Sequence, residues 1–94
     1  MRRILLVGAC LCCGVAMAQK ANPDIRSGNR AFDKEDYTQS EIDYRKGIQK
    51  EKNSTESHYN LGNSLYQQGK YQEAAKAFNQ AAQLTDDKEK KASI

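Results

Sequence analysis

The sequence predicts an all-α protein built from repeated helical hairpins. Between residues 57 and 78, large apolar residues alternate with very small ones at helical spacing, in two amphipathic patterns separated by Gly69. A small residue on one helix lets the neighbouring backbone approach closely, so the two patterns are expected to pack as an antiparallel hairpin. The same pattern recurs 34 positions earlier without a gap, where Gly28-Asn29 corresponds to Gly62-Asn63. Because one hairpin cannot bury its apolar face alone, the repetition predicts two stacked units.

The first residues have the pattern of a secretory signal peptide. Two arginines precede an uncharged run, residues 4–15, and Ala-Met-Ala follows as the small-x-small site that signal peptidase favours. Cleavage is expected between Ala18 and Gln19, which makes residues 1–18 a leader and the product an exported, periplasmic protein. A retained membrane anchor is a weaker alternative because the run is shorter than the ~20 apolar residues a bilayer needs. Lipoprotein processing at Cys10 is another, but it leaves an unusually short apolar core.

Cysteine position and charge exclude several kinds of function. Cys10, Cys12 and Cys13 all lie inside the leader, so the processed chain is predicted to have no disulfide, thiol nucleophile or thiolate metal site. The formal net charge of +3 falls to about +1 when Arg2 and Arg3 are removed with the leader. Lysines alternate with acidic residues as on solvated helix faces, so no nucleic-acid surface is expected.

Two helices are predicted for the first unit. The first opens at Asn22, which can cap it, with Pro23 at its first position, and runs to about residue 34. The second follows Asp36, a further cap, and carries an apolar stripe of four residues that is expected to be buried: Tyr37, Ile42, Tyr44 and Ile48.

The second unit is predicted to have the same organisation. Asn53 or Ser54 caps the third helix, and Gly69 ends it in the left-handed conformation that glycine tolerates. Gly62 and Ala74 are expected to form the close contact between the third helix and the fourth, which runs from about residue 72 to 84. Residues 85–88 are then expected to turn the chain before another helix begins.

The order of these residues resembles the tetratricopeptide repeat, a 34-residue helical hairpin. The matching elements are Leu61-Gly62, Gly69-x-Tyr71, Ala74-x-x-x-Phe78 and Ala81. The resemblance implies a right-handed α-solenoid with two repeats within residues 19–88, at about 21–54 and 55–88. Residues 89–94 are then the start of a further helix in a truncated array. It also implies a non-catalytic protein that binds protein or peptide partners.

In this family the first helix of each repeat lines a concave groove. Carried over to this sequence, the groove would present Ile25, Asn29, Phe32, Asp33, Tyr59, Asn63, Tyr66 and Gln67. Amide side chains can bond an extended peptide backbone, and aromatic rings supply rigid contact area. Alternatively, these residues serve mainly in folding. A carboxylate clamp, which some members use, is disfavoured because Ile25 stands where its essential lysine would be, although Asn29 and Asn60 occupy two of its positions.

No catalytic constellation is evident in the sequence. His58 is the sole histidine and is expected to pack against the preceding repeat, and the glycines are explained by helix packing and turns. The sequence therefore predicts no enzyme, cofactor, metal site or small-molecule substrate.

A narrower resemblance joins the whole sequence to the exported repeat proteins of the Bacteroides aerotolerance operon, often called BatC. It is carried by G-N-R-A-F-x-K-x-D-Y, E-I-D-Y-R-K-G-I and the D-D-K-E-K-K-A segment. It implies a periplasmic scaffold that works with membrane-tethered von Willebrand A-type proteins in a stress-related complex. The alternatives are a chaperone-like assembly factor for envelope proteins and, more weakly, repeats that position an enzyme encoded beyond residue 94.

Overall fold

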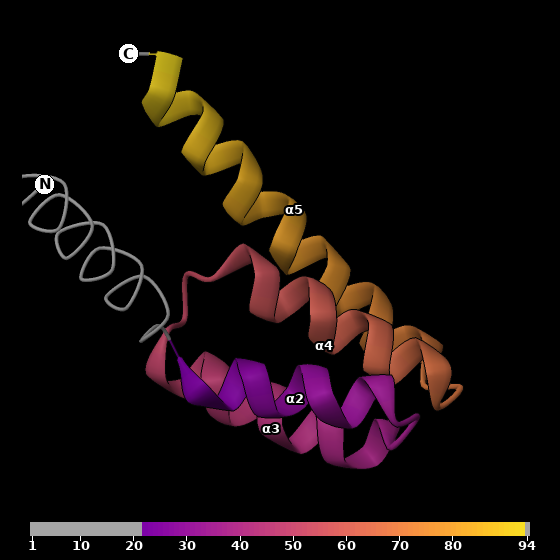
Figure 1. Ribbon diagram of the computed structural model, residues 1–94. Coiled ribbons are helices and arrows are strands. Elements are labelled where there is room, and N and C mark those ends of the chain that lie inside the picture. Colours follow the sequence, from indigo (N-terminus) through magenta and orange to yellow (C-terminus); the bar gives the residue numbers. More distant parts are fainter. Residues whose placement is uncertain (1–21, 94) are drawn as a thin grey trace, which may run out of the picture.

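Four helices make up the part of the chain that the computed structural model describes, residues 22–93, with side chains described through residue 90. They are α2 (Pro23–Asp33), α3 (Tyr37–Lys50), α4 (Thr55–Gln67) and α5 (Tyr71–Ser93). Each helix packs against the next one in the chain, so two hairpins stack side by side (Figure 1). No strand occurs between residues 22 and 93, and the predicted all-α fold is confirmed. The predicted leader and its three cysteines lie outside the described residues.

Polar side chains begin three helices by accepting hydrogen bonds from free backbone amides. Asn22 accepts from the amide of Asp24 and Asp36 from that of Gln39, each at 3.2 Å. Of the two candidate caps for α4, Ser54 accepts from the amide of Ser57, also at 3.2 Å. Short local hydrogen bonds therefore determine where each of these helices starts.

A glycine facing an aromatic ring sets the separation of the helices in both hairpins. A Cβ atom added to Gly28 would lie 2.6 Å from the ring of Tyr44, and one added to Gly62 would lie 2.6 Å from the ring of Phe78. The predicted partner of Gly62 was Ala74, but the three atoms nearest to the added Cβ all belong to Phe78. Ala74 is buried in the core cluster against which Phe78 packs.

The core runs continuously through both hairpins. Its buried members are Ile25, Tyr44, Leu61, Leu65, Ala74 and Ala77, with Ile48 and Phe78 packed against them. Ile42 was predicted to be buried but is 43% exposed. Each residue turns a helix by about 100°, so Ile42, two positions from the buried Tyr44, faces the opposite side of α3.

Two buried serines join the hairpins. The hydroxyl oxygens of Ser40 on α3 and Ser64 on α4 are 2.6 Å apart, and both residues are fully buried. Ser40 also donates to the carbonyl of Tyr37 at 2.9 Å. Because a hydroxyl has one proton, the proton between the serines belongs to Ser64. The contact satisfies both hydroxyls and brings the two helices close together.

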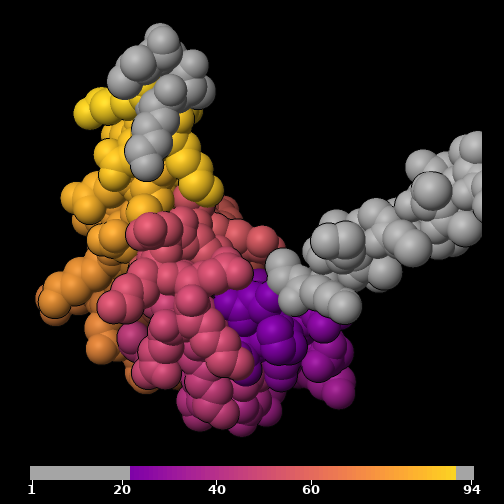
Figure 2. All heavy atoms as spheres, turned by 90° about the vertical axis from the view of Figure 1, so that its left-hand side faces the viewer, coloured from indigo at the N-terminus to yellow at the C-terminus, as the bar shows by residue number. Residues whose placement is uncertain are grey.

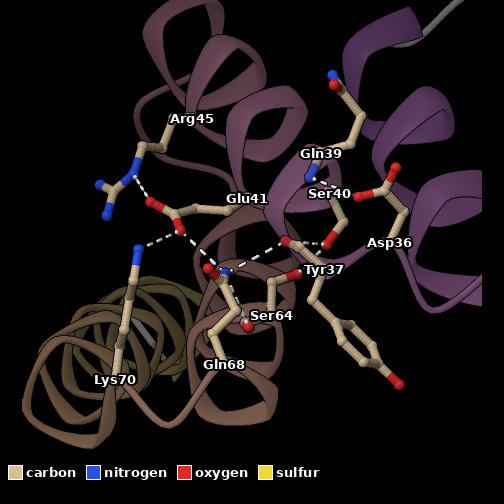
Figure 3. A network of polar contacts seen from close by, with 9 residues as sticks. All are labelled: Asp36, Tyr37, Gln39, Ser40, Glu41, Arg45, Ser64, Gln68 and Lys70. Atoms are coloured by element: carbon tan, nitrogen blue, oxygen red, sulfur yellow. Dashed lines mark hydrogen bonds and ion pairs between the residues drawn. The ribbon is translucent and has the colours of Figure 1, made fainter.

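Beside the serines, Glu41 on α3 gathers donors from its own helix and from the second hairpin (Figure 3). It accepts from Arg45 Nε at 2.9 Å, from Gln68 Nε2 at 2.9 Å and from Lys70 Nζ at 3.1 Å. Burial raises the pKa of this carboxyl, but the hydrogen bonds from Arg45, Gln68 and Lys70 outweigh it and hold the pKa below its usual 4.5. The folded state therefore favours the ionised form.

The predicted turn at residues 85–88 is wrong, because α5 continues without interruption from Tyr71 to Ser93. This segment contains neither glycine nor proline, and its lysine, glutamate and alanine residues are good helix formers. Thr85 donates its hydroxyl proton to the carbonyl of Ala81 at 3.0 Å, a bond compatible with the helix. The end of α5 accordingly projects past the other helices (Figures 1 and 2).

The packing of Gly62 gives a test of the hairpin. Gly62→Leu should lower the free energy of unfolding by about 1–3 kcal/mol, because the new side chain must displace the Phe78 ring. Thermal and urea melts followed by circular dichroism measure the loss. The double variant Gly62→Leu/Phe78→Ala opens space for the leucine and should be less destabilised than the sum of the two single variants. Additive losses would contradict the contact.

The lowered pKa of Glu41 predicts a pH-dependent contribution to stability. A carboxyl whose pKa is lower in the folded than in the unfolded state stabilises the protein above the unfolded value, and this stability is lost as the pH falls through the folded value. The difference in free energy of unfolding between wild type and Glu41→Gln should therefore be largest above pH 4.5 and should shrink as the pH falls below this value.

Urea melts from pH 7 downward measure that gap. Glu73→Gln is the control, since Glu73 is exposed and forms no ion pair within residues 22–90. A gap for Glu41→Gln that stays constant across the acid range would contradict the network.

Candidate functional site

A pocket of about 330 Å³ lies where the first hairpin meets α4. We call it the α2–α4 pocket; six residues line it: Asn29, Phe32, Asp33, Tyr44, Asn60 and Asn63. Three come from α2, one from α3 and two from α4. The pocket therefore exists only when the two hairpins are stacked.

Asn29 organises the hydrogen bonds of the pocket. Its Oδ1 accepts from the hydroxyl of Tyr44 at 2.6 Å and from Asn60 Nδ2 at 3.3 Å. The bond from Tyr44 on α3 orients the Asn29 amide, and the bond from Asn60 connects α2 to α4. With Oδ1 doubly occupied, the Nδ2 group of Asn29 keeps its protons for other acceptors.

The pKa of Tyr44 reflects its burial and the negative charges near the pocket. Burial, followed by the negative charges of Asp33, Glu56 and Asp43, raises the pKa of Tyr44 to about 12. The hydroxyl thus remains protonated and donates to Asn29 over the whole physiological range. The three carboxylates therefore lie near enough to Tyr44 to act on its hydroxyl.

Four of the eight predicted groove residues meet in this pocket: Asn29, Phe32, Asp33 and Asn63. Ile25 does not join them. It is only 8% exposed, and its side chain packs against Gly47 on α3 inside the first hairpin. Ile25 is therefore a core residue, and a partner in the groove would not touch it.

The other three predicted residues lie elsewhere on α4. Tyr59 packs against Phe78 at a ring-centroid distance of 5.6 Å, and Tyr66 packs edge-on against Tyr71 at 5.1 Å. Tyr66 is 56% exposed, whereas its neighbour Leu65 is 1% exposed and fills the inward position. Gln67 is exposed at the end of α4. None of the three lines the pocket, but Tyr59 lies one turn before Asn63 on α4, and Tyr66 and Gln67 lie one turn after it, so all three share the face of α4 that carries Asn63.

Tyr44 and Asn60 belong to the pocket but were absent from the predicted groove. Apolar periodicity assigns Tyr44 to the core of the hairpin, which is correct for its ring, while its hydroxyl reaches Asn29. Asn60 falls one helical turn before Ser64, on the side of α4 that faces the first hairpin. A tyrosine predicted to be in the core must find a hydrogen-bond partner for its hydroxyl, and this requirement could have pointed to an acceptor such as Asn29.

A second groove, of about 560 Å³, lies on α3, α4 and α5. It is lined by Arg45, Ile48, Gln49, His58, Leu61, Leu65, Glu73, Lys76, Ala77 and Gln80. The Nε2 atom of His58 lies 2.9 Å from the carbonyl of Lys52, to which it donates. His58 thus secures the connection between the hairpins, and no nucleophile is bonded to it in the described part of the chain.

Two further properties concern residues 22–93 alone. No group of three or more histidine, cysteine, aspartate and glutamate side chains is arranged there to hold a metal ion. None of the four helices has the length and apolar character needed to cross a membrane.

Comparison with known proteins identifies the second hairpin. The family model described as tetratricopeptide repeat matches residues 55–88, which cover α4 and most of α5. The first hairpin shares its geometry, since Gly28 faces Tyr44 as Gly62 faces Phe78. No curated protein matches the chain.

Proposed function

We propose that the protein is a non-catalytic scaffold and that its α2–α4 pocket binds an extended segment of a partner protein. Residues 55–88 are a tetratricopeptide repeat. Tetratricopeptide repeats mediate protein–protein interactions. The observation that carries the proposal is the convergence of three asparagines and two aromatic rings on one pocket, from helices of both hairpins.

The chemistry of the pocket suits a peptide backbone. An extended strand offers alternating carbonyls and amides, and an asparagine side chain can both donate and accept. The Nδ2 group of Asn29 is held in place by the two bonds to its Oδ1, so it is oriented before a partner arrives. Phe32 adds apolar contact area at the edge of the pocket.

The pocket can be tested separately from the fold by comparing Asn63→Ala with Leu61→Ala. Asn63 is half-buried at the pocket, so its loss should change the free energy of unfolding by no more than about 0.5 kcal/mol while weakening partner capture. Leu61 is 5% exposed, so Leu61→Ala should cost about 2–5 kcal/mol and abolish capture by unfolding the repeat.

The measurement combines circular dichroism melts with pull-down of partner proteins from envelope extract. Asn79→Ala is the matched control, because Asn79 is an exposed asparagine of α5 outside the pocket. Equal capture by wild type and Asn63→Ala would rule out the pocket as the working surface.

We also propose that the protein is exported and acts in the periplasm, within a stress-related assembly that includes von Willebrand A-type membrane proteins. The leader pattern of residues 1–18 and the resemblance to the aerotolerance-operon proteins support this setting. A chaperone-like assembly role in the same compartment is the alternative use of the same groove.

Export predicts a defined new N-terminus. Mass spectrometry of the protein from its native envelope should find a chain that begins at Gln19. A chain that begins at a lipid-bearing Cys10 would instead place the protein on a membrane surface, and an intact leader would contradict cleavage. An Ala18→Leu variant, which disrupts the small-x-small site, should accumulate unprocessed.

A further inference from the structure

The α2–α4 pocket carries one formal charge, and it is negative. Asp33 is the only charged side chain among the six lining residues; no lysine, arginine or histidine lines the pocket. Asp43 and Glu56 lie close enough to act on Tyr44 at its base, so nearby acids reinforce the same sign.

Asp33 is available to a partner. It is exposed at the last position of α2 and forms neither an ion pair nor a side-chain hydrogen bond with any residue from 22 to 90. Arg30 and Lys34 are close to it in sequence, but neither bonds to it. A cation that reaches the pocket therefore does not have to displace an existing ion pair.

The neutral groups of the pocket add acceptors for a donor-rich ligand. The hydroxyl of Tyr44 is buried and its proton is committed to Asn29, so it orients that amide rather than binding a ligand. Asn60 gives an Nδ2 proton to Asn29, and its own Oδ1 accepts no bond from residues 22–90. Together with the carboxylate of Asp33, this oxygen favours a ligand that brings several N–H groups.

Phe32 supplies an aromatic surface next to that carboxylate. Its ring meets Tyr37 at a centroid distance of 5.1 Å in an edge-on arrangement, which fixes the ring against α3. A guanidinium or ammonium group over an aromatic face gains a further electrostatic attraction. An aromatic ring beside a carboxylate is therefore suited to a basic side chain.

The size of the pocket is suited to one side chain. Its volume of about 330 Å³ is near the lower end of ligand pockets, roughly 300–1,000 Å³. We infer that the α2–α4 pocket selects an arginine or lysine side chain, arginine above lysine, within the extended segment of the partner. This inference rests on the proposed function and specifies the chemistry of the segment that the groove accepts.

Four capped pentapeptides that differ only at the central residue test the selection: Ac-Gly-Ala-X-Ala-Gly-NH₂, with X as arginine, citrulline, leucine or glutamate. Citrulline has nearly the shape of arginine without its charge. Each is titrated into ¹⁵N-labelled protein up to about 5 mM, since a single-site contact is expected to bind in the millimolar range. The readout is the shift of the backbone amide of Asp33 and the side-chain amides of Asn29 and Asn63.

The arginine peptide should shift these signals at the lowest concentration, and the glutamate peptide should shift them least. Asp33→Asn should weaken arginine binding about two- to fivefold, as expected for an exposed ion pair, and should leave citrulline binding unchanged. Glu73→Gln removes one negative charge outside the pocket and is the matched control. Circular dichroism melts confirm that both variants remain folded.

The outcomes separate the selection from the groove itself. Equal shifts with arginine, citrulline and leucine would overturn the selection of a basic side chain while leaving the groove as a peptide site. Strongest binding of the glutamate peptide, or an Asp33→Asn variant that binds arginine as wild type does, would overturn it as well. Shifts by no peptide would also overturn it, and the Asn63→Ala capture experiment then decides separately whether the pocket binds a partner at all.

Discussion

The rest of the structure depends on a close approach between a helix glycine and an aromatic ring, made once in each hairpin. Gly28 faces Tyr44, and Gly62 faces Phe78, at separations that leave no room for a Cβ atom. Interiors are packed densely enough that one added methyl group is felt. These contacts bring the two helices of each hairpin together, and that spacing decides which residues can reach the neighbouring hairpin.

Tyr44 shows how core packing and the candidate site are coupled. Tyr44 is 2% exposed; its ring fills the space beside Gly28, and its hydroxyl holds the amide of Asn29 in the pocket. Asn29 in turn accepts from Asn60 on α4, beside the buried pair of Ser40 and Ser64. The pocket geometry is therefore a consequence of how the hairpins stack, and a change in the stacking would alter the site without touching its surface residues.

Sequence periodicity predicted where the helices begin better than it predicted where α5 ends or which side chains are buried. It identified the starts of α2, α3 and α4, because a cap depends on residues within one turn of each other. The prediction of a turn at residues 85–88 was wrong because it rested on threonine and aspartate, which favour turns only weakly. The segment has no glycine or proline to end the helix, so α5 continues through it. Ile42 was misplaced because its apolar character was weighed without its angle around α3.

The sequence by itself determined the all-α class and the period of 34 residues, and the family resemblance it carries predicted four of the six residues that line the pocket: Asn29, Phe32, Asp33 and Asn63. The class and the period follow from the spacing of apolar and small residues, whereas the four pocket residues were carried over from the positions that line the groove in the family. Only the tertiary structure decided that Ile25 is buried, that the ring of Phe78 lies nearest to Gly62, and that Tyr44 and Asn60 complete the pocket. Those facts depend on the distance and rotation between helices, which are set by many side-chain contacts acting together and cannot be read from the period of any one helix.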